Sequence, residues 1–596
     1  MSDQSKALRG GEFLIRETTA DAIFIPEEWT EEQLMMKQMT LDFVEQRIIP
    51  NLERIEQQEE GLVPQLMEEA GELGLIGSSV PEDLGGMGLD FKSTMLITEA
   101  IGGAHSFSVS FSAHTGIGTL PILYYGNDAQ KKQWIPGLAS GQLKGCYCLT
   151  EPSAGSDANN GKTTAKLTED GMHYLINGQK MWITNGGFAD VMIVFAKIDD
   201  DENLTAFIVD GHAEGISKNP EEKKMGIKGS STRQIFFNDV KVPVENLLYE
   251  RQKGFKIAVN ILNIGRIKLG GAVLGAAKDA CTHAVRYANE REQFGRPISK
   301  YGAIRYKLAE SAIRLFTKES ALYRATQNID DAIAALKAGG MEHGEATLKG
   351  IADFAPECAM MKVLGSEVLD YVVDETVQIH GGMGYSAETR AELAYRDARI
   401  NRIFEGTNEI NRMLTVDMIL KKAMKGEIDL MTPAMAISSE LTGVPDMTPP
   451  PTDLFEKQLQ YVRNFKKAIL LVAGSAAQKL MMSLAKEQEI LMNIADMAIW
   501  AYTAESTILR VQKLRGLRGN DADLSVQEAI MRVYTYQVSE WIHSAGKEAL
   551  LAFAEGDELK MMLMGMKRFA KTEDFNTKEA RQLIAMHLIE KNEYGL

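Results

Sequence analysis

A block of strand-type sequence between two helical stretches constrains the fold more than any other feature. From about Gly145 to about Leu248, short β-favouring runs such as TTAKL, MHYLI and QKMWIT alternate with turn signals. The tripeptide EDG at 169–171 and the dipeptide NG at 177–178 separate these three runs, so both predict hairpin turns. The block as a whole predicts a small all-β domain inserted into a mainly helical chain.

The stretches on either side of this block have helical periodicity. In the first stretch, Thr30 followed by Gln33 has the pattern of a capping box, and Pro50 ends the run that begins there. Helical spacing returns at Gly254 and continues to about Glu427. Residues 430–452 contain five prolines and are interpreted as a linker, after which helical patterns resume.

This organisation predicts an α+β multidomain fold that is mainly α. A chain of 596 residues is long enough for two to four folding units. The predicted units are an N-terminal helical domain (1–143), a middle β domain (144–252), a second helical domain (253–429), the linker (430–452) and a further C-terminal helical domain (453–596).

Charge and composition exclude several classes of protein. The formal net charge of -17 argues against nonspecific nucleic-acid binding. The first residues, MSDQSKALRGGEFLIRET, resemble neither a signal peptide nor a transit peptide, and the longest apolar run, AILLVAG at 468–474, is shorter than the ~20 residues of a spanning helix. We therefore expect a soluble, cytoplasmic protein. Its four cysteines do not have metal-binding spacing, so we expect no metal site.

Two motifs in the β block could contact a ligand with a flat ring or a phosphate. The segment YCLTEPSAGSD (147–157) combines a small-residue turn with the hydroxyls of Thr150, Ser153 and Ser156. In KMWITNGG (180–187), Trp182 and Thr184 are two residues apart, so on a strand both would point to one side. Taken alone, each motif is more often a tight loop or part of a core.

Three further motifs lie in the second helical domain. REQFGRP (291–297) offers Arg291 to a phosphate, and the glycines of QIHGGMGY (378–385) would let backbone approach a ligand closely. In RIFEGTNEI (402–410), Glu405 precedes Gly406 and Thr407. A lone glutamate is usually a solvated one, so this residue gains meaning only in combination with the other motifs.

Together and in this order, the five segments resemble the acyl-CoA dehydrogenase family over roughly residues 30–425. EKKMGIK (222–228), FEGTNEI (404–410) and the additional C-terminal helices resemble the very-long-chain branch and a relative that doubles as a respiratory-complex assembly factor. The resemblance implies an N-terminal helical domain, a middle β-barrel and a C-terminal helical bundle, followed here by an extra helical domain. It also implies FAD as the cofactor and an acyl-CoA as the substrate.

The resemblance implies particular site residues, with Glu405 at the position of the catalytic base. The positions that match FAD contacts are Tyr147, Leu149, Thr150, Ser156, Trp182, Thr184, Arg291, Phe294, Gln378, Gly381, Gly382, Thr407 and Glu409. The positions that match substrate contacts are Ser156, Asn263, Arg266 and Gly406. The contacts matched by Arg291, Phe294 and residues 378–382 are made partly across a subunit interface in this family.

Two positions depart from patterns found elsewhere in the family. Some branches place the base at the position of Gly265, but glycine cannot remove a proton, which leaves Glu405 as the candidate. Several members have a glutamine that touches FAD eleven residues after the match to Arg291, where this chain has Gly302. We therefore do not expect that contact here.

The implied reaction is the FAD-dependent conversion of an acyl-CoA to a trans-2-enoyl-CoA in fatty acid β-oxidation, with electrons passed to electron-transfer flavoprotein. Medium-chain members close the acyl pocket with a glutamate where this chain has Ala113, which favours a longer acyl chain, although simple helix packing explains a small residue equally well. An acyl-CoA oxidase, or a flavoprotein scaffold with secondary catalysis, remains an alternative.

The C-terminal region raises two further expectations. By resemblance to the very-long-chain branch, it would cover a face through which smaller members form tetramers, so we expect a homodimer. Lys421, Lys422 and Lys425 provide positive charge before the linker, and peripheral membrane contact there stays open because acidic residues lie among them.

Overall fold

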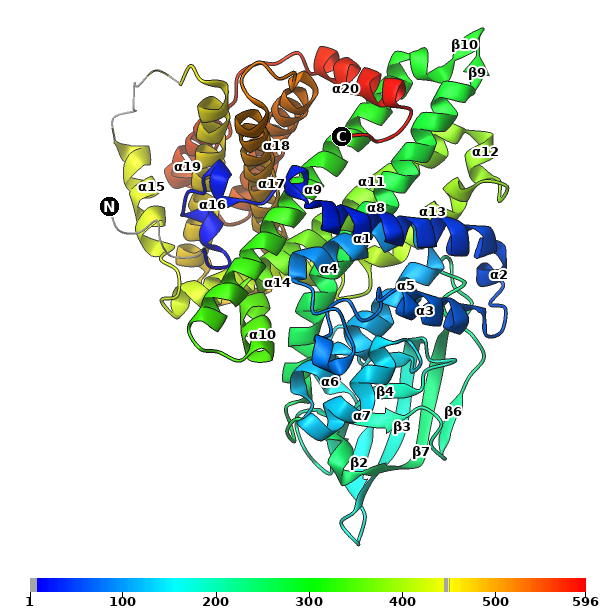
Figure 1. The fold of residues 1–596 in the computed structure, drawn as a ribbon. Coiled ribbons are helices and arrows are strands. Elements are labelled where there is room, and N and C mark those ends of the chain that lie inside the picture. Colours follow the sequence, from blue (N-terminus) through cyan, green and yellow to red (C-terminus); the bar gives the residue numbers. More distant parts are fainter. Residues whose placement is uncertain (1–7, 444–448, 450) are drawn as a thin grey trace.

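The computed structural model describes residues 8–443, 449 and 451–596 of the chain. In Figure 1 the β domain lies at the lower end of the molecule, the helices of the N-terminal and second helical regions lie beside and above it, and a further bundle of helices packs at the upper left. The part of the predicted linker at 444–448 and 450 lies outside the described residues.

The N-terminal region is helical, as the periodicity predicts. Thr30 caps the first α-helix with its side chain, and Gln33 completes the predicted capping box, which is confirmed. Its helices are α1 (Glu31–Phe43), α2 (Leu52–Glu56), α3 (Leu62–Glu72), α4 (Phe91–Ile101), α5 (Ser106–Ala113), α6 (Leu120–Tyr125) and α7 (Asp128–Ala139).

The middle region is an eight-stranded sheet around one apolar cluster. The strands follow the order β6-β7-β3-β2-β4-β5-β8, with β1 paired to β4. Their bounds are β1 (Gly145–Cys148), β2 (Thr164–Leu167), β3 (His173–Thr184), β4 (Val191–Ile198), β5 (Thr205–Asp210), β6 (Ile216–Lys218), β7 (Thr232–Pro243) and β8 (Leu247–Leu248). The EDG turn predicted at 169–171 is confirmed, since it joins the antiparallel strands β2 and β3.

The second predicted hairpin turn, NG at 177–178, is wrong. Strand β3 continues through both residues, and its pairing with β7 shifts register between Ile176 and Gly178. A Cβ at Gly178 would lie 2.6 Å from the Thr163 hydroxyl oxygen. The glycine therefore permits a β-bulge and a close backbone approach, and the same composition does not make a turn here.

The second helical region is built on two helices of 37 residues, α8 (Gly254–Glu290) and α9 (Gly302–Ala338). Helix α8 packs along α11 and also contacts α4 and α9. The remaining elements are the short strands β9 (Glu292–Gln293) and β10 (Arg296–Pro297), followed by α10 (His343–Asp353), α11 (Ala355–His380), α12 (Gly382–Tyr385), α13 (Arg390–Ala398) and α14 (Asn408–Met424).

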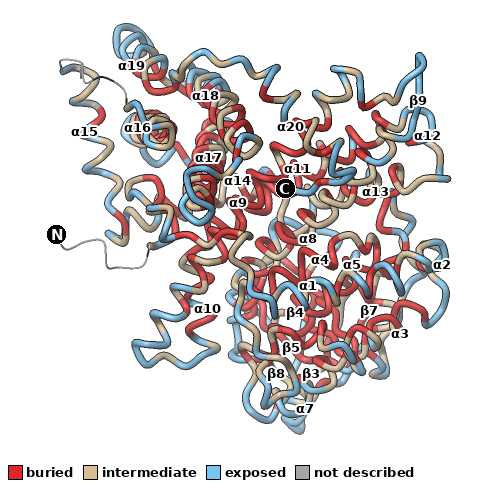
Figure 2. Tube along the Cα trace, turned by 45° about the horizontal axis from the view of Figure 1, so that its top comes forward, coloured by how far each residue is buried: buried red, intermediate tan, exposed pale blue. Residues whose placement is uncertain are grey.

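The C-terminal bundle starts within the predicted linker, because residues Met431–Thr442 form helix α15. It continues with α16 (Leu454–Leu480), α17 (Gln488–Arg518), α18 (Ser525–Phe553), α19 (Gly556–Phe569) and α20 (Thr577–Lys591). Helix α17 packs on α9 and α14, and α20 returns to α9. The buried residues run without a break from α8 and α11 into α17 (Figure 2), so this bundle shares a core with the preceding region.

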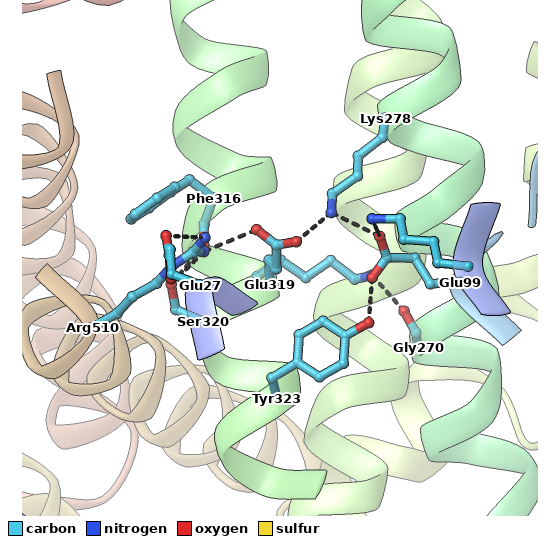
Figure 3. A network of polar contacts seen from close by, with 11 residues as sticks. Glu27, Glu99, Gly270, Lys278, Phe316, Glu319, Ser320, Tyr323 and Arg510 are labelled. Carbon is cyan, nitrogen blue, oxygen red and sulfur yellow. Dashed lines mark hydrogen bonds and ion pairs between the residues drawn. The ribbon is translucent and has the colours of Figure 1, made fainter. Parts of the chain in front are cut away.

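A chain of buried charged groups joins three regions of the molecule (Figure 3). Lys278 on α8 lies 2.8 Å from Glu99 on α4 and also pairs with Glu319 on α9. Arg510 on α17 lies 2.9 Å from both Glu319 and Glu27. These five charged groups thus pair with groups of opposite charge, and the buried Lys318 beside them donates instead to the Gly270 carbonyl.

Two helices are long and apolar enough, by length and composition, to cross a membrane: α8 and the segment Leu454–Lys486 that begins with α16. Most of the apolar window in α8 is buried inside the structure, and 39% of the window in the second segment is buried. The core helices of soluble proteins meet the same criterion. This finding alone therefore places neither helix in a membrane.

Candidate active site

Glu405 lies in a short loop whose backbone conformation is unusual. The base loop (residues 404–407) joins α13 and a 3₁₀ turn to α14, and Thr407 caps α14 by accepting a hydrogen bond from the Ile410 N–H. Glu405 has φ of 58° and Gly406 has φ of 81°. Glycine adopts a positive φ readily, whereas glutamate does so rarely, so the surrounding contacts must hold Glu405 in place.

The carboxylate of Glu405 faces the backbone of α8 at Gly265. A Cβ at this position would lie 2.6 Å from Glu405 Oε2, so only glycine leaves room for the carboxylate. That oxygen is buried and has no hydrogen-bond partner among the described residues. Burial raises the pKa of Glu405 to about 7, against the opposing influence of Arg266 and Lys362.

Three side chains, one each from α8, α11 and α14, donate hydrogen bonds to the carbonyl groups of the base loop. Arg266 Nε on α8 donates to the Glu405 carbonyl at 3.3 Å. Lys362 Nζ on α11 donates to the Gly406 carbonyl at 2.7 Å and to Asn408 Oδ1 at 2.8 Å. Asn411 Nδ2 lies 3.3, 2.8 and 3.0 Å from the carbonyl oxygens of residues 405, 406 and 407, respectively.

Sequence reasoning missed Lys362 and Asn411. Both residues are completely buried, and burial lowers the pKa of Lys362 to about 8. A signal was present in the sequence: Lys362 interrupts the apolar run CAMMKVLG, where a lysine needs a buried acceptor. The sequence could not show that the acceptors belong to a loop more than forty residues away.

Of the predicted substrate contacts, Asn263 and Arg266 lie beside the base. Arg266 Nη1 donates to Asn263 Oδ1 at 2.8 Å, and both residues are buried on α8. Gly406 is in the base loop itself. Ser156 is exposed on the loop that follows β1.

The β domain brings Tyr147 close to the base. Burial raises the pKa of Tyr147 well above its usual range, and the negative charge of Glu405 raises it further. Its hydroxyl is buried without a hydrogen-bond partner among the described residues. Leu149 is buried two residues later, and the Thr150 carbonyl accepts a hydrogen bond of 2.9 Å from the Met181 N–H on β3.

That hydrogen bond brings the loop after β1 next to Trp182 and Thr184. Trp182 is 59% exposed and has φ of 56°, and the β3–β7 register shifts again between Lys180 and Ile183. The indole thus stands on a bulge of the strand. Beneath it, Lys180 Nζ forms a buried ion pair with Glu151 at 2.6 Å and donates to the Leu149 carbonyl, which fixes the loop.

A second group of predicted FAD residues lies elsewhere on the chain. The outer cofactor group consists of Arg291, Phe294, Gln378, Gly381 and Gly382, and all five are exposed. A stack of Tyr287 on His380, with ring centroids 4.1 Å apart, joins the ends of α8 and α11 that carry this group. Strands β9 and β10 and helix α12 accordingly lie near one another (Figure 1).

The structure separates this outer cofactor group from the base. Gln378 follows Lys362 by sixteen residues on the same helix, a distance of about 24 Å along its axis. Thr407 and Glu409, the last predicted FAD residues, are next to the base; Thr407 caps α14 and the exposed Glu409 lies in its first turn. One chain therefore holds two separate groups of predicted cofactor residues.

The geometry fits an enzyme that binds a cofactor next to a buried general base. A carboxyl group with a pKa near 7 is suited to take a proton at neutral pH. The unpartnered Tyr147 hydroxyl, the exposed Trp182 indole and the fixed loop after β1 offer a polar edge and a flat apolar surface. These are the contacts that an isoalloxazine ring requires, so the residues present fit FAD.

Family comparisons identify this fold. Models of the acyl-CoA dehydrogenase N-terminal, middle and C-terminal domains match residues 30–142, 146–240 and 252–420. A further model, also described as an acyl-CoA dehydrogenase C-terminal domain, matches residues 464–568.

Individual relatives and a solved structure support the same family assignment. A probable acyl-CoA dehydrogenase of Bacillus subtilis is 44% identical, and the match covers 98% of each chain. The crystal structure of an acyl-CoA dehydrogenase complexed with FAD from Bacillus anthracis has 45% identity and a TM-score of 0.95, over 99% of this chain and 100% of that one. The very long-chain specific acyl-CoA dehydrogenase of Rattus norvegicus is 43% identical over 57% of this chain and 51% of its own length.

The chain belongs to the acyl-CoA dehydrogenase family. It is an FAD-dependent oxidoreductase that dehydrogenates acyl-CoA.

Proposed function

We propose that this enzyme dehydrogenates long-chain acyl-CoA in fatty acid β-oxidation, with Glu405 as the base and electron-transfer flavoprotein as the electron acceptor. The observation that carries the base assignment is the buried, unpartnered Glu405 Oε2 opposite Gly265. An oxygen that is buried and has no hydrogen-bond partner among the described residues is available to take a proton, and the pKa near 7 suits proton removal at neutral pH.

The residues around Glu405 account for proton removal from a very weak carbon acid. The α-proton of a thioester becomes removable only if the carbonyl oxygen receives hydrogen bonds that strengthen as negative charge develops there. The backbone N–H of Glu405 is the proposed donor, and the left-handed loop holds that N–H and the carboxylate on one residue. Bound FAD supplies the acceptor for the β-hydride. Exclusion of water from the site then strengthens the electrostatic interactions of the base with the reacting atoms.

A cavity along α8 supports the preference for long chains. Its lining includes the small residues Gly102, Gly103, Ala272 and Ala276, together with the polar side chains of His105, Asp279 and Asp397. Ala272 and Ala276 follow Gly265 by seven and eleven residues, so they lie within about 20° of its face and about 10 and 16 Å further along the helix. Ala113, predicted from the sequence to leave the acyl pocket open, is buried on α5. An acyl chain that starts at Glu405 and follows this face would end in the cavity.

A substitution at the far end of the cavity tests the chain-length proposal. In Ala276→Phe we expect kcat/KM for palmitoyl-CoA to fall about 10-fold or more because the ring fills the cavity, while octanoyl-CoA is turned over as before. Ala303→Phe, at an exposed position on α9, is the control. Wild-type enzyme that prefers octanoyl-CoA, or an equal loss for both substrates in Ala276→Phe, would count against the proposal.

The electron acceptor needs its own test because an acyl-CoA oxidase shares the reaction up to flavin reduction. We expect the substrate-reduced enzyme to be reoxidised rapidly by electron-transfer flavoprotein and slowly by oxygen. Rapid formation of hydrogen peroxide in air would instead favour an oxidase. Flavin that no acyl-CoA of any length reduces would favour a scaffold whose C-terminal helices recruit a partner.

We further propose a cytoplasmic homodimer. The exposed outer cofactor group supports the dimer, because an aromatic ring as exposed as Phe294, at 94%, gains by burial against a second surface. Sedimentation equilibrium of the holoenzyme tests it, and a monomer that keeps its FAD would contradict it.

Peripheral membrane contact is a separate proposal for the segment around α15. Lys425 is exposed there, next to exposed Met424, Met431 and Met435. Cations beside apolar side chains favour an anionic lipid surface. Sedimentation with vesicles that contain phosphatidylglycerol tests this contact, and protein that stays in the supernatant at low salt would remove it.

A further inference from the structure

We propose that Lys362 and Asn411 are positioning residues that hold the base loop in its left-handed conformation and so keep Glu405 aimed at the substrate. This inference rests on the proposed role of Glu405 as the base. Among the described residues, both side chains donate to backbone carbonyls of the loop, while Glu405 Oε2 has no hydrogen-bond partner.

The contacts converge on consecutive carbonyl groups. The oxygens of residues 405, 406 and 407 all lie within hydrogen-bond distance of Asn411 Nδ2, and Lys362 Nζ adds a second donor to Gly406. Three successive carbonyls can turn toward one side chain only if the chain leaves the ordinary helical and extended conformations, as the positive φ values of Glu405 and Gly406 show. These donors thus specify the conformation that orients the base.

The two donors come from different parts of the fold. Asn411 follows Thr407 by one helical turn on α14, so it links the loop to the helix that the loop begins. Lys362 lies on α11, which packs against both α8 and α14, and its contact with Asn408 fixes the start of α14 as well. Lys362 thereby links the base loop to α11, which packs on α8, the helix that carries Gly265. A shift of α14 would therefore move Glu405 relative to α8.

Lys362 carries a charge and Asn411 does not, so only the loss of Lys362 should change the pKa of Glu405 through its charge. Arg266 on α8 and Lys362 on α11 are the charged groups that lower the pKa of Glu405. The charge of Glu405 in turn raises the pKa of Tyr147 on β1. Glu409 on α14 and Glu367 on α11 face Lys362 in turn. Loss of Lys362 removes one of the two cations that favour the ionised base, whereas loss of Asn411 changes geometry alone.

The test measures anaerobic flavin reduction by palmitoyl-CoA as a function of pH, per bound flavin, in holoenzyme. For Asn411→Ala we expect the limiting rate to fall about 10- to 100-fold with an unchanged pH midpoint. For Lys362→Met we expect a comparable fall and a midpoint at higher pH, since the base then loses its proton less readily. Lys362→Arg, which keeps the charge, should restore the midpoint.

A matched control separates positioning from general stability. Lys466→Met removes another buried lysine, on α16, whose partner is Glu505 in the C-terminal bundle. We expect it to lower the unfolding temperature while its rate per flavin and its pH midpoint match those of the wild type. Glu405→Gln run in parallel tests the base assignment on its own.

Two results would overturn the inference. One is a rate within about twofold of wild type for both Lys362→Met and Asn411→Ala, when Glu405→Gln has lost reduction. The other is an equal effect of Lys466→Met on the rate. If Lys362→Met does not fold, Asn411→Ala and Lys362→Arg still decide the matter. If Glu405→Gln keeps full reduction, the proposed base is wrong, and that result is distinct from either of these.

Discussion

The base loop and the outer cofactor group are both made of residues that match the family's site, yet their surroundings in this structure are opposite. Glu405 is enclosed by α8, α11 and α14 of its own chain, which supply donors to each carbonyl around it. Arg291, Phe294 and Gln378 stand exposed, and Gln378 lies about 24 Å from Lys362 along α11. This difference fits the proposed homodimer, in which one chain would complete the acid–base part of the site and the part facing the rest of the cofactor would need a second surface.

The largest effect on the enclosed part is expected at Gly265. In Gly265→Ala, the new Cβ would lie 2.6 Å from Glu405 Oε2, so the carboxylate must move away from its position. We expect flavin reduction to slow about 100-fold or more, because a displacement of this size disrupts the geometry of proton removal. Gly302→Ala is the control, since a Cβ there meets nothing within 4 Å. Equal rates for the two variants would show that the base is not held against α8.

The exposed part is tested by its effect on cofactor affinity. In Arg291→Gln we expect FAD to bind about 10- to 100-fold more weakly, because a charge-assisted hydrogen bond to a phosphate is lost. Arg286→Gln, five residues earlier on α8 and also near the surface, should keep normal FAD affinity. Titration of apoenzyme with FAD measures both. Unchanged affinity in Arg291→Gln would exclude this group from the cofactor site.

The pH dependence of the wild type follows from the raised pKa of Glu405. Burial favours the neutral acid, so the carboxylate forms only as the pH passes about 7. A base acts when deprotonated, and the rate of flavin reduction should therefore rise with pH and level off above the pKa. We expect about a tenfold lower rate one unit below it. A pH-independent rate between about pH 5 and 9 would contradict the burial of the base.

The smallest effect on catalysis is expected in the buried charge network of Figure 3. Arg510→Met leaves Glu27 and Glu319 without that partner, which should lower the free energy of unfolding by about 3 kcal/mol. The rate per bound flavin should stay within about twofold of wild type, since no network residue contacts the base loop. Denaturant unfolding and rapid kinetics on the same sample give both quantities. A strong loss of rate would show that the C-terminal bundle acts on the site.

How much could be predicted from sequence depends on the range of the interaction. The capping box at Thr30 and the EDG turn at 169–171 are decided by residues within one turn, and both predictions are confirmed. The NG turn at 177–178 failed because a long-range contact decides that position: Thr163 lies against Gly178, and the pairing of β3 with β7 continues past it.

The candidate site shows the same division. The sequence implies Glu405 as the base only through the resemblance that the five motifs carry together, since a lone glutamate in a loop is usually solvated. Lys362 and Asn263 come from two other helices, and only the packing of α8, α11 and α14 brings them to Glu405. The sequence likewise could not show that Arg291 and Glu405 belong to separate parts of one chain.

The most direct test of the account is anaerobic titration of the holoenzyme with palmitoyl-CoA, followed by flavin absorbance, in wild type and Glu405→Gln. The account predicts that the oxidised flavin bleaches in the wild type and stays oxidised in Glu405→Gln, although the variant still binds FAD and substrate. Bleaching of both proteins at similar rates would contradict the central claim that Glu405 is the base.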